Sequence, residues 1–191
     1  MTKMFLAALC SLCAGAAVAA PVTYQIDPAH TFPSFEADHF GGLSVWRGRF
    51  DHTTGKIVFD KDAKSGTVEV TVDAASVDFG NPKLNEHVKS NEMFDVAQFP
   101  NATFKGTLAE FKDGAPTAAR GEFTLHGVTR PLNLTIRSFK CLINPMSKKE
   151  VCGADITGVL NRADYGVNYG EKLGFKMDVK LFIQVEAIRA E

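Results

Sequence analysis

The amino-acid sequence predicts an all-β protein, an antiparallel β-barrel of about eight strands with one short helix in a crossing loop. Most of the chain after residue 20 alternates apolar and polar side chains, as strands do when one face is buried and the other is solvated. The alternating runs follow one another at hairpin spacing, which fits either a β-sandwich or a closed barrel. The last run, residues 175–187, is the longest, and such a strand must bend or belong to two sheet halves. This length favours the barrel.

The expected strands are separated by turn signals rich in glycine, asparagine and aspartate. In chain order they cover residues 30–40, 44–51, 57–59, 67–73, 102–111, 119–125, 130–136, 154–161 and 175–187. Pro33 has no N–H to donate, so the first half of its strand is expected at an edge or a bulge. The strand at 57–59 is expected to begin after a turn at Thr54 and Gly55.

One segment, residues 82–91, lacks this alternation. Leu84 and Val88 lie four residues apart in it, and that spacing places both on one face of a helix. A short helix or helical turn is therefore expected in a loop that crosses one end of the sheet.

Phenylalanine dominates the aromatic residues, with 15 Phe against 3 Tyr and 1 Trp. These side chains either fill the core or line a cavity, and their number alone does not decide between the two. Gly106, Gly121 and Gly158 fall at inward positions, where small residues suit tight curvature or a cavity. A barrel of about eight strands has room for one small ligand.

Length and charge restrict the class of protein. A chain of 191 residues suits one domain, and its 21 basic and 22 acidic side chains give a formal net charge of -1. A nucleic-acid-binding protein would need a basic excess, and so would a protein held to a membrane by electrostatic attraction. Neither class fits this balance.

Residues 1–19 are expected to be a cleaved signal peptide. Lys3 supplies a positive charge, an apolar run follows as far as Val18, and Ala17-Val18-Ala19 fits the small-x-small cleavage pattern. An uncleaved N-terminal anchor is the alternative. No later segment is long and apolar enough to cross a bilayer, so stable membrane insertion is not expected. The expected product is one exported domain, residues 20–191.

Two cysteines, Cys141 and Cys152, remain in this expected domain, in a loop-like stretch. In an oxidising compartment such a pair forms a disulfide, here across a hairpin-sized loop, with a contribution of about 2–3 kcal/mol to stability. A metal site would need further ligands, and no histidine lies nearby in the sequence. We expect a structural disulfide and no metal site.

The sequence contains no local pattern of a catalytic or cofactor site. H-E-x-x-H is absent, and so are the nucleophile-elbow, P-loop and dinucleotide-binding fingerprints. No catalytic residues, no enzyme activity and no cofactor are therefore expected. His39 shares a face with Phe35 and Ala37, and is either a structural histidine or a polar contact at a cavity mouth. Residues 161–166 are either a capped turn with an Arg–Asp pair or a contact to a ligand head group.

Four stretches of the chain carry a likeness to a known family. They are Tyr24–His30 with His39 and Arg47–Phe50; Ala75–Asp78 with His87–Ser90 and Met93–Asp95; Phe99–Phe104; and Gly121–Pro131 with Asn161–Gly166. In these stretches the sequence resembles the YceI-like family of periplasmic, polyisoprenoid-binding, lipocalin-like proteins. It departs from the family pattern at Pro33, at Leu84-Asn85, and at Val88 and Lys89.

The resemblance implies a lipocalin-like barrel in the periplasm with an elongated apolar tunnel. It implies a long-chain isoprenoid or quinone-like lipid in the tunnel, with the polar head near the mouth, and a homodimer of the kind that several relatives form. The candidate ligand contacts are Phe35, His39, Phe40, Trp46, Phe50, Met93, Phe94, Phe104, Phe123, Asn161, Arg162 and Tyr165.

The leading hypothesis is therefore a periplasmic carrier of such a lipid, which requires a hollow interior. A stress-related interaction module, whose phenylalanines fill the core, is the first alternative. The second alternative is an enzyme that acts on the lipid, with His39 or His87 as the acid–base group at the mouth.

Overall fold

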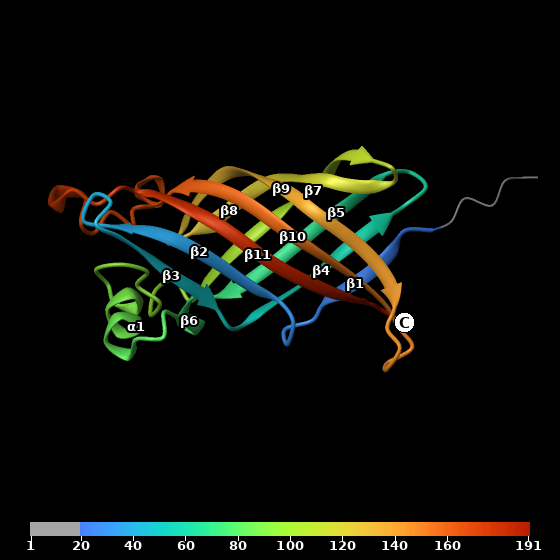
Figure 1. Ribbon diagram of the computed structural model, residues 1–191, viewed down its shortest axis with the longest axis horizontal. Coiled ribbons are helices and arrows are strands. Elements are labelled where there is room, and N and C mark those ends of the chain that lie inside the picture. Colours follow the sequence, from blue (N-terminus) through green and yellow to red (C-terminus); the bar gives the residue numbers. More distant parts are fainter. Residues whose placement is uncertain (1–19) are drawn as a thin grey trace, which may run out of the picture.

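A computed structural model describes residues 20–191, and the expected signal peptide, residues 1–19, lies outside the described residues. The described chain forms a closed antiparallel β-barrel with a short helix at one end (Figure 1). The strands are β1 Val22–Ile26, β2 Phe32–His39, β3 Ser44–Phe50, β4 Thr53–Asp60, β5 Ser65–Asp73, β6 Val77–Asp78, β7 Asn101–Lys112, β8 Ala115–Leu125, β9 Val128–Ile143, β10 Glu150–Asn161 and β11 Asp178–Arg189. The helix α1 spans Pro82–Lys89, and short 3-10 turns span Ala74–Ser76, Arg162–Tyr165 and Glu171–Leu173.

The 11 strands occupy 8 positions around the barrel, because three positions are each shared by two consecutive strands. β1 and β2 share one position beside β11, and they pair on their other side with β4 and β3. β5 and β6 follow as the next shared position, next to β4 and β3. β7, β8, β9 and β10 then complete the ring in chain order. The predicted antiparallel barrel is confirmed.

The wall has a seam between β1 and β2, where residues 27–31 leave the sheet. Thr31 is almost fully buried there, and its hydroxyl donates to the carbonyl oxygen of Glu186 and accepts from the amide of the same residue, at 3.1 Å in each case. The amide of Asp27 also donates to the Glu186 carbonyl, at 2.9 Å. The Thr31 side chain thus supplies hydrogen bonds to β11 at the gap between β1 and β2, on the side of β11 that faces away from β10.

The beginning of β4 corrects one sequence expectation. β4 begins at Thr53, so the predicted turn at Thr54 and Gly55 is wrong, and the chain bends earlier, at residues 51–52. Gly55 lies within β4 opposite Val70, with φ of 149°, and a Cβ at this position would collide with the backbone of Glu69. The glycine is needed here for the close approach of two strands and not for a turn.

The start of β11 and the presence of β1 also differ from the expectation. β11 begins at Asp178, because Gly170 and Gly174 take left-handed conformations on either side of a 3-10 turn and leave Phe175 in a loop. β1 is absent from the predicted strands, since a run of 5 residues is too short to show a clear alternation.

The predicted helix is confirmed as α1. The side-chain oxygen of Asn81 accepts hydrogen bonds from the amides of Lys83 (3.1 Å) and Leu84 (3.3 Å), and Pro82 occupies the first turn, where its missing N–H is not needed. Val88 is buried and Leu84 is half-buried against the core, so α1 packs over one end of the barrel. Within residues 20–191, no helix combines the length and hydrophobicity needed to span a membrane.

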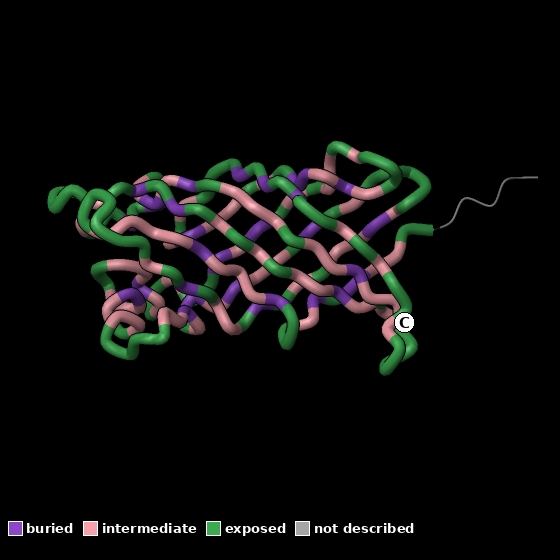
Figure 2. The backbone as a smooth tube through the Cα atoms, viewed as in Figure 1, coloured by how far each residue is buried: buried purple, intermediate pink, exposed green. Residues whose placement is uncertain are grey.

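Strand alternation determines what the barrel encloses. Figure 2 shows buried and exposed residues alternating along the strands. The main core cluster includes Val68 and Val72 on β5 and Leu132 and Leu134 on β9. A smaller cluster around Tyr24 adjoins it, and Ile57 and Leu108 pack against both clusters. The side chains of both clusters face the interior of one barrel.

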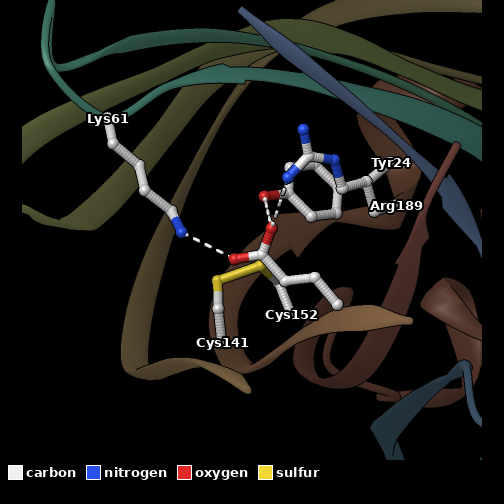
Figure 3. The surroundings of a disulfide bond; sticks show 6 residues. Tyr24, Lys61, Cys141, Cys152 and Arg189 are labelled. Atoms are coloured by element: carbon white, nitrogen blue, oxygen red, sulfur yellow. Dashed lines mark hydrogen bonds and ion pairs between the residues drawn. A yellow bond between two sulfur atoms is a disulfide. The ribbon is translucent and has the colours of Figure 1, made fainter. Parts of the chain in front are cut away.

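The smaller cluster lies beside the hairpin that joins β9 to β10. The predicted disulfide is confirmed there between Cys141 and Cys152. The two cysteines lie in paired strands, directly opposite each other, and not in the expected loop-like stretch. Cys152 is buried against Phe59 and Ala187, and Cys141 is half-buried. The disulfide therefore fastens the hairpin at its base, at the edge of the apolar interior (Figure 3).

Glu150 accepts three hydrogen bonds next to this disulfide (Figure 3). They come from Tyr24 Oη at 3.0 Å, Lys61 Nζ at 2.8 Å and Arg189 Nη1 at 3.4 Å. The bond from Lys61 is the largest cause of a lowered Glu150 pKa, and burial opposes it. Burial, with a smaller effect from Glu150, raises the pKa of Tyr24 to about 12. The carboxylate thus connects β1, β10, β11 and the β4–β5 turn.

We expect Gly121→Ala to lower the free energy of unfolding by about 1–3 kcal/mol, because the new methyl group overpacks the wall. Gly121 lies opposite Gly106 on β7, and a Cβ on Gly121 would collide with the backbone of Lys105. Urea denaturation measures the change. Gly153→Ala is the matched control, since its new Cβ would lie 3.7 Å from the nearest atoms. Equal stability of the two variants would contradict the close approach.

We expect Glu150→Gln to reduce stability at neutral pH by about 1 kcal/mol and to reduce the loss of stability in acid. The folded-state pKa of Glu150 lies below its ordinary value of 4.5, so its pairing stabilises the fold above that pH. This contribution is lost as the pH falls through the lower, folded-state value. Urea denaturation as a function of pH tests this expectation. Glu69→Gln is the control, because Glu69 forms an exposed ion pair with Lys56. An acid profile identical to that of the native protein would contradict the expectation.

Candidate functional site

A cavity of about 490 Å³ extends through the barrel. Its volume falls in the range of about 300–1,000 Å³ that is typical of small-molecule pockets. Side chains from all the strand positions line it, and most of them are apolar. The lining extends from Tyr24 and Phe139, at the disulfide end, to Trp46 and Phe175, at the end covered by α1. The interior is therefore hollow, and the filled core required by the interaction-module alternative is not found.

Four aromatic side chains gather at the α1 end of the cavity, and we call them the aromatic mouth: His39, Phe40, Trp46 and Phe175. The His39 ring lies edge-on to the other three, with centroids 4.6 Å from Phe40, 5.5 Å from Trp46 and 5.3 Å from Phe175. All four line the cavity, and Phe40 is also 51 % exposed. At this end the apolar interior reaches the solvent.

Asp38 holds together the two loops that carry the aromatic mouth. Its Oδ2 accepts from the amide of Gly41 at 2.8 Å, within the β2–β3 turn, and from the amide of Lys176 at 2.9 Å, in the loop before β11. The Lys176 amide is the largest cause of a pKa of Asp38 below its ordinary value. Asp38 is therefore an anion at neutral pH, and its position is fixed by backbone donors.

Arg162 brings a buried positive charge to the cavity lining. The residue is 8 % exposed, and its guanidinium donates to the carbonyl oxygens of Val167 (2.7 Å) and Tyr169 (2.8 Å). Burial lowers the pKa of Arg162, while the charges of Glu171 and Asp38 oppose this shift. The guanidinium remains protonated at any physiological pH. Its direct partners are neutral carbonyls, so the cavity contains a cation that is only partly compensated.

Two histidines line the α1 end of the cavity. His39 Nδ1 lies 3.4 Å from the hydroxyl oxygen of Ser44, near the solvent. His87, on α1, has its ring 4.6 Å from that of Tyr169, and its Nδ1 lies 3.3 Å from a carboxylate oxygen of Glu92. Each histidine thus has a polar neighbour outside the cavity.

The structure brings 10 of the 12 candidate contacts to the cavity. They are Phe35, His39, Phe40, Trp46, Phe50, Met93, Phe94, Phe104, Phe123 and Arg162. They come from four strands, the turn after β2, the loop after α1 and the 3-10 turn after β10. Whether they contact a ligand stays a prediction.

Asn161 and Tyr165 are the two candidates outside the lining. Asn161 accepts from the amide of Ala163 at 3.0 Å and donates to Asp178 at 3.0 Å, so it caps the 3-10 turn. Tyr165 is buried with its ring 5.6 Å from that of Phe123, and burial raises its pKa. Asn161 therefore caps the turn as expected, but Arg162 binds the carbonyls of Val167 and Tyr169 in place of the expected Arg–Asp pair. Contact of this segment with a head group stays a prediction.

Some lining residues that the sequence did not mark lie outside the strands. Phe79, Tyr169 and Leu173 line the α1 end, but no alternation marks segments of this kind. Phe175 falls within the expected strand 175–187 but lies in the loop before β11. The two glycines at 170 and 174 are the signal that could have identified this loop as a folded structure of its own.

Potential metal ligands cluster at the opposite end. Among residues 20–191, ligand atoms of Cys141, Glu150 and Cys152 lie within 4.8 Å of one another. Both sulfur atoms are joined in the disulfide, and a metal would need them as thiolates. This cluster is therefore a structural cross-link in the state described.

Comparison with known proteins places these features in a family. A family model described as the YceI-like domain matches residues 24–187. Protein YceI of Salmonella arizonae is 32 % identical over 177 residues, which cover 92 % of this chain and 90 % of the relative. The crystal structure of a YceI protein from Campylobacter jejuni has a TM-score of 0.66 and 25 % identity, covering 78 % of this chain and 88 % of that chain.

A second solved structure shares the fold at lower identity. It is a polyisoprenoid-binding domain from Saccharophagus degradans, with a TM-score of 0.65 and 17 % identity, covering 88 % of this chain and 99 % of that chain. The family model and the Salmonella relative both extend over nearly all of the barrel described above. This chain belongs to the YceI-like family.

Proposed function

We propose that this protein binds one long-chain lipid of the isoprenoid class inside the barrel and carries it through the periplasm. The observation that carries the proposal is the apolar cavity of about 490 Å³, with buried Arg162 near one end. Each CH₂ group that leaves water for such a cavity contributes about 0.8 kcal/mol. A hydrocarbon chain therefore needs no specific contact along its length. The polyisoprenoid-binding domain with the same fold supports this class of ligand.

The polar head of the lipid lies at the α1 end in this proposal. A guanidinium presents N–H donors in a planar fork that suits phosphate, carboxylate or carbonyl oxygens. Arg162 uses two of these donors on backbone carbonyls, which hold the group in place. The rings of the aromatic mouth then surround the first part of the chain. Both an isoprenoid phosphate and a quinone-like lipid carry acceptor oxygens on the head group, which can accept hydrogen bonds from the Arg162 guanidinium in this orientation.

Binding is favoured over catalysis by how the polar groups at this end are engaged. Asp38 is held by two backbone amides, Arg162 by two backbone carbonyls, and His87 lies close to Glu92. A general acid or base must instead be available to the reacting atom of the substrate. The groups here are arranged to hold a structure in place, which suits a carrier.

The periplasmic location rests on two supports. The Cys141–Cys152 disulfide suits an oxidising compartment, and the sequence of residues 1–19 has the expected pattern of an export signal. The homodimer implied by the family resemblance stays a prediction, which sedimentation velocity of the purified protein would check.

We expect Ile156→Trp to abolish lipid binding, because the larger side chain occupies the middle of the cavity. Ile156 lines the cavity from β10, whereas Val159 on the same strand is exposed on the outside. Val159→Trp is therefore the matched control. Native mass spectrometry of the exported proteins is the measurement. The native protein and the control should carry a long-chain lipid, and finding no lipid on the native protein, even after incubation with isoprenoids, would contradict the proposed function.

We expect Arg162→Met to weaken binding of an isoprenoid phosphate about tenfold or more, because a hydrogen bond to a charged group is lost. Binding of the corresponding isoprenoid hydrocarbon, which has no head group, should change little. Displacement of a fluorescent fatty acid measures both affinities, and thermal denaturation monitors the loop that Arg162 supports. An equal loss of both ligands would show that Arg162 supports the fold and does not select a head group.

A further inference from the structure

The hairpin between β9 and β10 exposes apolar side chains at the end of the barrel opposite α1. Ile143 is 62 % exposed, Met146 is 91 % exposed, and Leu142 and Pro145 between and beside them are exposed as well. The hairpin extends past the barrel near the C-terminus (Figure 1). Apolar residues grouped at the tip of a projecting element mark an interaction site more often than isolated ones do.

Basic residues flank this apolar tip, and acidic residues are absent from it. Residues 140–149 include Lys140, Lys148 and Lys149 and no aspartate or glutamate. All three lysines are exposed. Lys149 pairs with Glu191 at 3.0 Å, but both side chains are open to solvent, so a stronger anion can replace this partner.

The nearest acidic residue in the sequence does not offset this charge. The Glu150 side chain is only 17 % exposed, and its carboxylate pairs with Lys61 and Arg189. The formal net charge of the whole chain is -1, so the positive charge of the hairpin is a local feature. A balanced total charge does not exclude electrostatic attraction between such a local cluster and a membrane.

The hairpin tip is also a rigid structure. The disulfide fixes its base, and the side-chain oxygen of Asn144 accepts from the amides of Met146 (2.8 Å) and Ser147 (3.1 Å). The amide of Lys148 donates to the Asn144 carbonyl at 2.8 Å. A tip that is already ordered loses little conformational entropy when it binds.

We propose that the β9–β10 hairpin, residues 140–152, is a surface anchor for bilayers that contain anionic phospholipid. Apolar side chains with lysines beside them suit the boundary of a bilayer, where the apolar groups reach the acyl region and the ammonium groups reach the phosphates. An acidic protein surface would pair with the lysines, but it offers no apolar layer for Ile143 and Met146. The proposal concerns the outside of the barrel and does not depend on what the cavity holds.

Co-sedimentation of the exported, disulfide-bonded protein with vesicles tests this proposal. The probe vesicles contain phosphatidylglycerol and phosphatidylcholine in equal parts, and the reference vesicles contain phosphatidylcholine alone. We expect binding to the first kind, weakened by salt, and far weaker binding to the second. Equal binding to both kinds, or binding to neither, would overturn the anchor.

Paired variants separate charge from apolar contact. Lys148→Gln with Lys149→Gln should weaken binding to the anionic vesicles about 25-fold, since each lysine near such a surface contributes a factor of about five. Lys105→Gln with Lys112→Gln, two exposed lysines of β7, is the matched control and should change the affinity less than about twofold. Ile143→Ser with Met146→Ser should also lose binding although it keeps every lysine. Equal effects of the hairpin and β7 lysines would overturn the proposal.

Two further measurements give independent outcomes. In Met146→Trp, the emission of the introduced tryptophan should shift to shorter wavelength when anionic vesicles are added, because its ring enters the bilayer boundary. An unchanged spectrum would count against insertion of the tip. Sedimentation velocity examines the other occupant, a second copy of this chain: a dimer that Ile143→Ser with Met146→Ser dissociates would assign the hairpin to self-association and overturn the membrane anchor.

Discussion

Hydrogen bonding of β11 on both of its sides is the constraint on which the rest of the structure depends. One side pairs with β10 from Asp178 to Ile188, and the other pairs with β2 and then with β1. This closes the sheet, leaves no long exposed edge, and fixes the circumference of the ring. Once the circumference is fixed, the side chains of the inner face can line the interior without meeting across it. The apolar cavity is thus a consequence of closure combined with alternation.

The binding site divides into two parts with different origins. Strands provide the apolar walls, such as Phe104 on β7 and Phe123 on β8. The polar groups near the α1 end lie at the end of β2 (Asp38), on α1 (His87) and in the 3-10 turn after β10 (Arg162). Asp38 and Arg162 are held mainly by backbone amides and carbonyls of neighbouring loops. The walls therefore suit any chain of sufficient length and hydrophobicity, and discrimination between head groups falls to a small number of residues at one end.

The sequence predicted the wall better than the mouth, for a physical reason. A period of two assigns Phe35 and Phe123 to an inward face without knowledge of the fold. Phe175 and Tyr169 reach the same cavity from a loop whose path depends on left-handed glycines and long-range hydrogen bonds, and no local period records these. Glycine is common in turns, so Gly55 indicates a turn from the sequence alone. The structure shows that a glycine is needed there because the backbone of the neighbouring strand comes too close for a Cβ. Whether the phenylalanines of the barrel fill it or line a cavity depends on the volume that the closed sheet encloses, and no alternation pattern contains that volume.

The break between β1 and β2 interrupts the strand that lies beside β11. Around Glu186, the hydroxyl of Thr31 and the amide of Asp27 take the place of a paired strand. The chain can therefore pass from β1 to β2 without leaving unpaired backbone groups of β11 against the cavity, which Thr31 also lines. Position 31 consequently needs a side chain that both donates and accepts a hydrogen bond, which a valine of the same shape does not offer.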